Sequence, residues 1–226
     1  TSMQTLLKTY DITFKDDFNR TTGLGANWTV VSGSWTIANN MLTPGVGTEQ
    51  LDTAATYTAA QWNAIMVAVD YQTIYQNNTG WIYIPYQDAN NYIRVGVAQR
   101  AVATDTYESV IVGANVGGVY TTIATRDTPF SDLNDWRHIK IYSTASGTSR
   151  IVVVETNGVE LLNVTIANTS TFSGSLRIEG TVANYDNFIL AAATNQLTAG
   201  TFDSTSTSVT ETFNNDTNLT ALNWIT

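Results

Sequence analysis

Aromatic and charged side chains alternate with aliphatic ones along three stretches in the first half of the sequence. If each stretch is a β-strand that buries its aliphatic residues, the opposite face of the sheet presents the aromatic and charged ones. This pattern places Asp70, Trp81, Tyr83, Tyr92 and Arg94 on one shared sheet face. Aromatic rings stack on the apolar faces of sugars, and Asp and Arg bind hydroxyl groups. These residues form our candidate ligand-binding site, for a glycan.

The same residues also fit a different role. In this alternative the aromatic residues are covered by loops or by a neighbouring chain, or they belong to an ordinary second core. A register error of one residue would also exchange the two faces of every predicted strand. The sequence therefore leaves open whether this face binds sugar or is covered.

Residues suited to acid–base or nucleophilic catalysis are sparse. The closest pair of glutamates, Glu155 and Glu160, is five residues apart and straddles a predicted turn. The chain has no cysteine and one histidine, His138, so a Ser-His-Asp triad would have to use that residue. We interpret His138 as a structural residue of a strand. The prediction is a protein that is not an enzyme, although an acid pair assembled from separate strands stays open.

The elements that must position these residues are short β-strands. Alternating segments are separated by turn residues about every 8 to 12 positions, as in antiparallel sandwiches. Asn39-Asn40 and Asn157-Gly158 are typical of two-residue hairpin turns. We find no segment with helical periodicity. The predicted fold class is all-β, a two-sheet antiparallel jelly-roll sandwich.

One motif occurs twice. The pattern of Asp17-Phe18 followed by Trp28 returns near the end as Thr212-Phe213 followed by Trp224. Between the two copies, the chain becomes rich in Thr, Ser and Ala, as interdomain linkers often are. We therefore predict a lead-in at 1–11, a sandwich domain at 12–191, a linker at 192–210 and the truncated start of a second, similar domain at 211–226.

Composition excludes several classes of protein. The net charge of −9 argues against nucleic-acid binding, which requires a basic face. No apolar run approaches the length of a membrane span, so membrane insertion is not predicted. The absence of cysteine excludes disulfides and thiolate metal sites. No secretory signal is visible. If Met3 is the native start, the protein begins without an export signal, which would suit a cytoplasmic protein or one assembled into a virus particle.

The order of motifs resembles the concanavalin A-like lectin/glucanase sandwich, in its laminin G-like and 3-keto-disaccharide-hydrolase-like branches. The resemblance covers residues 12–191 and implies a two-sheet sandwich. In the lectins of this group, the concave face of the sandwich holds glycans. The Glu-x-Asp-x-Glu pattern of the glucanases in this fold is missing here. The matching motifs are Asp17-Phe18, Gly33-Ser34-Trp35, Gly80-Trp81-Ile82-Tyr83, Asn91-Tyr92-Ile93-Arg94, Trp136-Arg137-His138, Asn157-Gly158 and Tyr185-Asp186-Asn187-Phe188.

The resemblance also implies a metal site. Some relatives hold a structural Ca²⁺ where the first and last strands lie side by side, and oxygen ligands from paired strands suit that ion. In this sequence the matching acids are Asp17 and Asp186. The alternative is that Asp17 caps a turn and Asp186 is a polar edge residue.

These observations lead to three hypotheses about function. The first is a non-catalytic carbohydrate-binding or adhesion module of a longer multidomain protein, located on an extracellular surface or a virion. The second is a structural or assembly domain of a phage tail, fibre or capsid-decoration protein that binds no glycan. The third, and least favoured, is a glycoside-active enzyme. Expected partners are a glycan and neighbouring repeat domains or further copies in a homo-oligomer.

Overall fold

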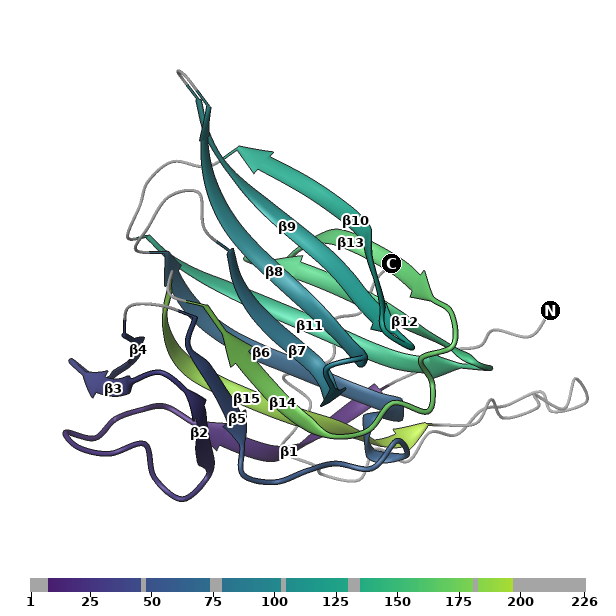
Figure 1. The fold of residues 1–226 in the computed structure, drawn as a ribbon, viewed down its shortest axis with the longest axis horizontal. Helices are drawn as coiled ribbons and strands as arrows, with labels where there is room; N and C mark the ends of the chain where they lie inside the picture. The colour runs from purple at the N-terminus through teal and green to yellow at the C-terminus, as the bar shows by residue number, and fades with distance from the viewer. Residues whose placement is uncertain are drawn as a thin grey trace, which may run out of the picture.

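The computed structural model describes residues 8–45, 48–73, 79–102, 105–129, 135–180 and 183–196. Within these ranges the chain folds into two antiparallel sheets, which Figure 1 shows as stacked layers. None of the helices described there is long and apolar enough to cross a membrane. The predicted all-β sandwich is confirmed.

The eight-stranded sheet contains, in spatial order, β13 (Val159–Ile166), β12 (Ser149–Thr156), β11 (Trp136–Ser146), β6 (Ala64–Thr73), β15 (Ala183–Gln196), β4 (Met41–Pro44) and β3 (Trp35–Ala38), with β1 (Lys8–Asp16) also paired to β15. The seven-stranded sheet contains β10 (Val119–Pro129), β9 (Asp105–Val116), β8 (Asn91–Val102), β7 (Thr79–Asp88), β14 (Ser175–Glu179), β5 (Gln50–Thr53) and β2 (Trp28–Ser32). One short 3-10 helix, η1 (Gln61–Asn63), precedes β6.

The core lies between the two sheets and follows the alternation of the sequence. Val67 and Val69 of β6 face Ile82 of β7 and Val95 of β8 across the interior, and all four are buried. Each such aliphatic side chain contributes roughly 1.5–3 kcal/mol when it leaves water. Burial of one face of each strand therefore fixes the register, since a slip of one residue would expose every one of these side chains.

Two hairpins confirm the turns predicted from asparagine. Asn39 and Asn40 join β3 to β4 with φ values of 55° and 59°. Asn157 and Gly158 join β12 to β13 with φ values of 51° and 80°. Asparagine and glycine tolerate this left-handed region, which matches the twist of a two-residue hairpin.

The opening motif closes one end of the sandwich. The Asp16 carboxylate accepts hydrogen bonds from Trp28 Nε1 at 2.7 Å, from Arg20 at 2.6 and 2.9 Å, and from the Phe18 amide at 2.8 Å. The Phe18 ring is fully buried and stacks on Trp28. Burial alone would raise the pKa of Asp16, but these hydrogen bonds and the charge of Arg20 lower it below its usual value.

A buried arginine ties η1 to the loop after β13. Arg150 donates hydrogen bonds to the Trp62 carbonyl, to the Thr169 and Ser170 carbonyls, and to Ser143 Oγ at 3.3 Å. Burial lowers the pKa of Arg150 to about 10. The cation is thus held by backbone oxygens, which satisfy its donors in the interior.

The first and last described strands lie side by side, as expected. β1 and β15 are antiparallel neighbours, with Lys8 opposite Gln196. Strand pairing thus begins before residue 12 and runs past residue 191. The predicted second domain start at 211–226 lies outside the described residues.

Candidate functional site

The outer face of the seven-stranded sheet carries most of the predicted site. Ile82 and Ile84 of β7 point into the core, so Trp81 and Tyr83 point outward. On β8, the buried Ile93 and Val95 leave Tyr92 and Arg94 on the same outer face. The contacts described below show that these four predicted residues lie together.

Arg94 is the centre of this aromatic face. Its guanidinium carbon lies 3.8 Å from the ring centroid of Trp81 and 4.5 Å from that of Tyr120 on β10. The rings of Tyr92 and Tyr83 are 5.6 and 5.8 Å away. Contacts of this kind hold a cation over aromatic rings and fix both partners. The result is a stiff platform built from three strands, β7, β8 and β10.

Two glycines let the rings lie close to the sheet. A Cβ atom at Gly96 would lie 2.4 Å from the Trp81 ring, and one at Gly113 would lie 2.4 Å from the Tyr120 hydroxyl. Gly96 is opposite Trp81 in the β7–β8 register, and Gly113 is opposite Arg94 in the β8–β9 register. A glycine in a strand often marks such a close approach. These two positions therefore make room for the platform.

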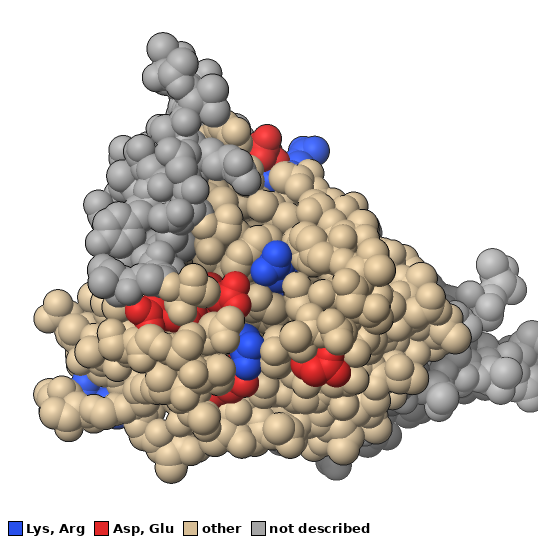
Figure 2. Space-filling model, viewed as in Figure 1, with Lys and Arg blue, Asp and Glu red and all other residues tan. Residues whose placement is uncertain are grey.

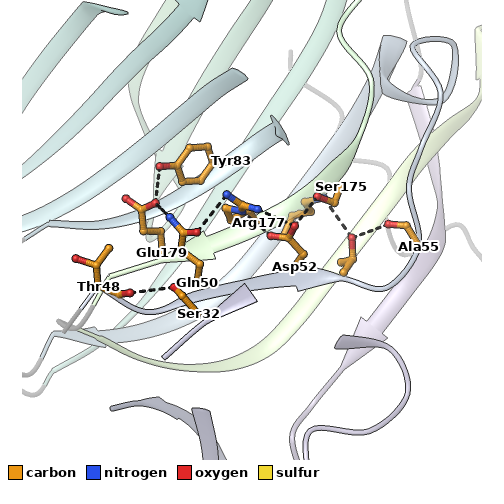
Figure 3. A network of polar contacts seen from close by, with 11 residues as sticks. Ser32, Thr48, Gln50, Asp52, Ala55, Tyr83, Ser175, Arg177 and Glu179 are labelled. Atoms are coloured by element: carbon orange, nitrogen blue, oxygen red, sulfur yellow. Dashed lines mark hydrogen bonds and ion pairs between the residues drawn. The ribbon is translucent and has the colours of Figure 1, made fainter. Parts of the chain in front are cut away.

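A carboxylate from β14 contacts two residues of the platform. Glu179 Oε2 accepts hydrogen bonds from the Tyr83 hydroxyl at 2.9 Å and from Gln50 Nε2 at 2.7 Å (Figure 3). Arg94 Nη1 lies 3.9 Å from Glu179 Oε1 and donates to the Tyr83 oxygen at 3.2 Å. Tyr83 is only 4% exposed, and burial followed by the charge of Glu179 raises its pKa. Tyr83 thus positions the site and has little surface for a ligand.

A second ion pair extends the same network toward β5. Arg177 Nε and Nη2 donate to the Asp52 carboxylate at 2.6 and 3.0 Å, and Ser175 Oγ donates to it at 3.2 Å (Figure 3). The guanidinium carbon of Arg177 also lies 3.4 Å from the ring centroid of Tyr86. Bidentate pairs of this kind are rigid as well as strong. This part of the face is therefore satisfied internally.

A hollow of about 520 Å³ opens beside the platform, over β7 to β10. Its size is within the usual range for a ligand site, about 300–1,000 Å³. Figure 2 shows this side of the molecule as mainly uncharged, with a few basic and acidic patches next to one another. The residues that line the hollow are aromatic or polar, apart from one isoleucine: Thr79, Trp81, Arg94, Tyr107, Ser109, Ile111, Tyr120, Thr122, Thr125 and Asp127.

The sequence analysis named only two of the residues that line this hollow, Trp81 and Arg94, and a bulge in β10 is one reason why others were missed. The pairing with β9 shifts between Thr122 and Ala124, which adds one residue at Ile123. The shift allows Thr122 before the bulge and both Thr125 and Asp127 after it to line the same hollow. Simple alternation would place Asp127 on the opposite face. Tyr120 lies before the bulge, where simple alternation still holds, and its aromatic ring was the signal that could have revealed it.

Asp70 was wrongly assigned to this face. It lies on β6 in the eight-stranded sheet, whereas Trp81 and Arg94 belong to the seven-stranded sheet. Its carboxylate contacts His138 Nδ1 at 2.6 Å and accepts a hydrogen bond from Asn187 Nδ2 at 2.9 Å. Alternation had correctly predicted that Asp70 points out of the core, but it could not predict which of the two sheets β6 joins.

The two acids expected at a metal site lie at the ends of paired strands. Asp17 follows β1, is exposed and accepts a hydrogen bond from the Asn19 amide at 3.2 Å. Asp186 lies on β15, and its pKa is raised by burial and by the charges of Asp70, Asp17 and Asp16. The described residues include no group of three or more acids or histidines that could hold a metal ion. This donor set does not fit Ca²⁺, which takes about 6–8 oxygen ligands.

Comparison with known proteins identifies the fold. No protein-family model matches the sequence, and neither does any curated protein. Solved structures do match. An endo-1,3-beta-glucanase from Streptomyces sioyaensis has a TM-score of 0.58 and 12% identity, over 86% of this chain and 100% of that one. The carbohydrate-binding module CBM66 from Bacillus subtilis has a TM-score of 0.54 and 15% identity, over 74% and 96%.

A third similar structure was solved with a glycan bound. The exoplasmic/lumenal domain of VIP36, in a form bound to Ca²⁺ and Man3GlcNAc, has a TM-score of 0.53 and 10% identity over 76% of this chain and 86% of that one. Identities this low establish architecture and leave function to the site itself. All three structures are concanavalin A-like sandwiches. This chain therefore has the concanavalin A-like fold that its motifs predicted.

Proposed function

We propose that this protein is a non-catalytic carbohydrate-binding module. The observation that carries the proposal is the hollow beside Trp81, Arg94 and Tyr120. Aromatic rings, a planar cation and several hydroxyl groups converge there, and these are the groups that sugars require. The 39% exposure of Tyr120 leaves part of the platform open to a ligand.

The arrangement favours binding over catalysis. On this face Asp52 is clamped by Arg177, and Glu179 accepts hydrogen bonds from Tyr83 and Gln50. A glycosidase needs one carboxyl group free to donate a proton and another free to act as nucleophile or base. These two acids instead stabilise the platform, which leaves Asp127 as the one described acid that lines the hollow, where a glycosidase would need two. Two of the similar structures are a carbohydrate-binding module and a domain in a Man3GlcNAc-bound form, which supports the same proposal.

The repeated motif in the sequence suggests the biological context. We infer that the module belongs to a longer protein with several similar domains, displayed on an extracellular surface or a virion, where adhesion to glycans is useful. Tandem modules would raise the overall affinity through multivalency even where each site binds weakly.

A glycan array tests the proposal. We expect the wild-type protein to bind at least one glycan, and the double variant Trp81→Ala, Tyr120→Ala to lose about 30-fold in affinity. A central aromatic anchor is worth about 2 kcal/mol or more, which corresponds to that factor. Tyr83 is a poorer choice for this test because it is buried and supports Glu179.

Trp136→Ala is the matched control. Trp136 is 42% exposed but lies on β11 in the other sheet, so its loss should leave glycan binding unchanged. Melting curves would confirm that all variants are folded. A folded wild-type protein that binds no glycan, or equal binding by the wild type and the double variant, would contradict the proposal.

One observation favours a second role, in assembly. The edge strand β2 exposes Val30 and Val31, at 45% and 46%, and pairs only with β5 among the described strands. An exposed edge with β-branched residues is suited to strand addition by another chain. Under this alternative, Val30→Lys would dissociate an oligomer seen by light scattering. A monomeric wild-type protein would remove the support for it.

A further inference from the structure

Asp127 forms the polar end of the hollow. It lies opposite Ser109 in the β9–β10 register, and the Ser109 hydroxyl donates a hydrogen bond to Asp127 Oδ1. Ser109 is only 2% exposed, whereas Asp127 is exposed and lines the hollow. A buried hydroxyl therefore orients an acid that faces the ligand space.

The remaining hydrogen-bonding capacity of Asp127 points to hydroxyl donors. A carboxylate has about four acceptor positions, and Ser109 is the described residue that fills one of them. Thr125 and Thr79 also line the hollow nearby and can donate or accept. Two neighbouring sugar hydroxyls can both donate to one carboxylate. This chemistry selects a ligand with a vicinal diol.

The charges around the hollow disfavour anionic ligands. Among the residues that the structure describes, the lining contains one arginine, Arg94, whose charge is shared with Glu179 and whose guanidinium lies between two rings. Asp127 adds a negative charge, and the chain as a whole carries −9. A carboxylated or sulfated sugar would be repelled by this field. The site therefore fits neutral sugars.

The hollow runs along strand β10. Asp127, Thr125, Thr122 and Tyr120 follow one another along β10, and the last lies opposite Asn115 of β9. Six residues of β9 separate Ser109, opposite Asp127, from Asn115, opposite Tyr120, which is roughly 20 Å at about 3.3 Å per residue. The Tyr120 hydroxyl reaches back over Gly113, which is still roughly 13 Å along the strand from Ser109. This span exceeds the length of one sugar ring. A ligand that uses both ends must have several units.

From these observations, and on the basis of the proposed function, we propose that the site binds a neutral oligosaccharide along β9 and β10. One of its sugar units presents a vicinal diol to Asp127, and another stacks at the Trp81–Tyr120 end. Asp127 is thereby the residue that determines specificity, and Ser109 is the residue that positions it.

Isothermal titration with two sets of probes tests this proposal. The neutral set contains β-1,3-gluco-, cello-, malto- and manno-oligosaccharides of two to five units, and the anionic set contains oligogalacturonates, heparin fragments and sialyl-oligosaccharides. We expect binding within the neutral set, with affinity that rises with chain length. Asp127→Ala should weaken it about tenfold, the loss expected when a charge-assisted hydrogen bond to a ligand is removed.

Two further variants make the outcome decisive. Glu160→Ala removes an exposed acid from β13 of the other sheet and should leave binding unchanged. Ser109→Ala should reduce the preference for the parent sugar over its single-deoxy analogues, which a loss of stability alone would not do. Binding that depends on Trp81 but prefers anionic probes, or is unaffected by Asp127→Ala, would overturn this inference and leave the proposed function standing. Absence of binding to both sets would overturn both.

Discussion

The outer faces of the two sheets differ, although both are built from strands with the same alternation. On the seven-stranded sheet, glycines at positions 96 and 113 lie beneath large rings, and a hollow opens next to them. On the eight-stranded sheet, the row across β11, β6 and β15 consists of His138, Asp70 and Asp186 in register. A hollow thus depends on small residues beside large ones, and alternation alone does not reveal this.

Among the changes that compare the two faces, the largest effect is expected from filling the space under the platform. In Gly96→Val, the new side chain would overlap the Trp81 ring, since even a Cβ there would be 2.4 Å from it. We expect glycan binding to fall at least about tenfold, together with a loss of about 2 kcal/mol of stability from overpacking. That loss corresponds to a melting temperature lower by about 4–8 °C. Titration and thermal unfolding would measure both.

Ala38→Val on β3 is the control for this substitution. Ala38 is exposed in a strand of the other sheet, so a larger side chain there meets no ring and should change neither quantity. Unchanged binding by Gly96→Val would mean that Trp81 can move without consequence. The contrast between the two faces would then have no functional meaning.

The second effect concerns the two carboxylates that best represent the two faces, Glu179 and Asp70. Glu179→Gln removes the charge near Arg94 and weakens the hydrogen bond from Tyr83, so the platform should loosen. We expect a loss of about 1 kcal/mol, or roughly fivefold in glycan affinity, because hydrogen bonds to charged groups are worth about that much or more. Affinity and melting temperature should fall together.

Asp70→Asn serves as the counterpart on the eight-stranded sheet. It disturbs the contacts with His138 and Asn187, which are remote from the hollow. The melting temperature should change, whereas glycan affinity should stay the same. An affinity loss in Asp70→Asn equal to that in Glu179→Gln would show that the two faces are coupled.

The wrong assignment of Asp70 shows which part of the site could be predicted from the sequence. Alternation correctly predicted the inward and outward faces of β6, β7 and β8, because burial of one face decides them. The order of strands within a sheet is decided by long-range pairing. β6 follows β5 in sequence but pairs with β11 and β15 in space. A site built from residues on separate strands therefore needs the topology as well as the pattern.

Asp127 shows a second limit. Its position on the outer face depends on the one-residue bulge at Ile123. Nothing in the surrounding sequence, a run of Thr, Ile and Ala residues, marks the position of a bulge. The glycines were equally hard to interpret, since a glycine in a strand can mark a bulge, a bend or a close ring. The aromatic residues were the strong signal, and they led to the correct face.

The smallest effect concerns the acidic row on the eight-stranded sheet. Asp186 lies directly opposite Asp70, and burial and the charges of Asp70, Asp17 and Asp16 raise its pKa. A raised pKa means that the folded state binds this proton more tightly than the unfolded state. Stability is therefore lost as the pH rises from the ordinary value of about 3.8 through the raised value. At neutral pH, the charge on Asp186 destabilises the fold.

Asp186→Asn should accordingly stabilise the protein at pH 7. We expect a gain of about 0.5 kcal/mol, typical of relieving two like charges on facing strands, or about 1–2 °C in melting temperature. At pH 3 the gain should vanish, because the wild-type carboxyl is then protonated in both states. Asp11→Asn, an exposed acid on the neighbouring β1, controls for the change in net charge. A gain that persists at pH 3 would place its cause outside this acidic row.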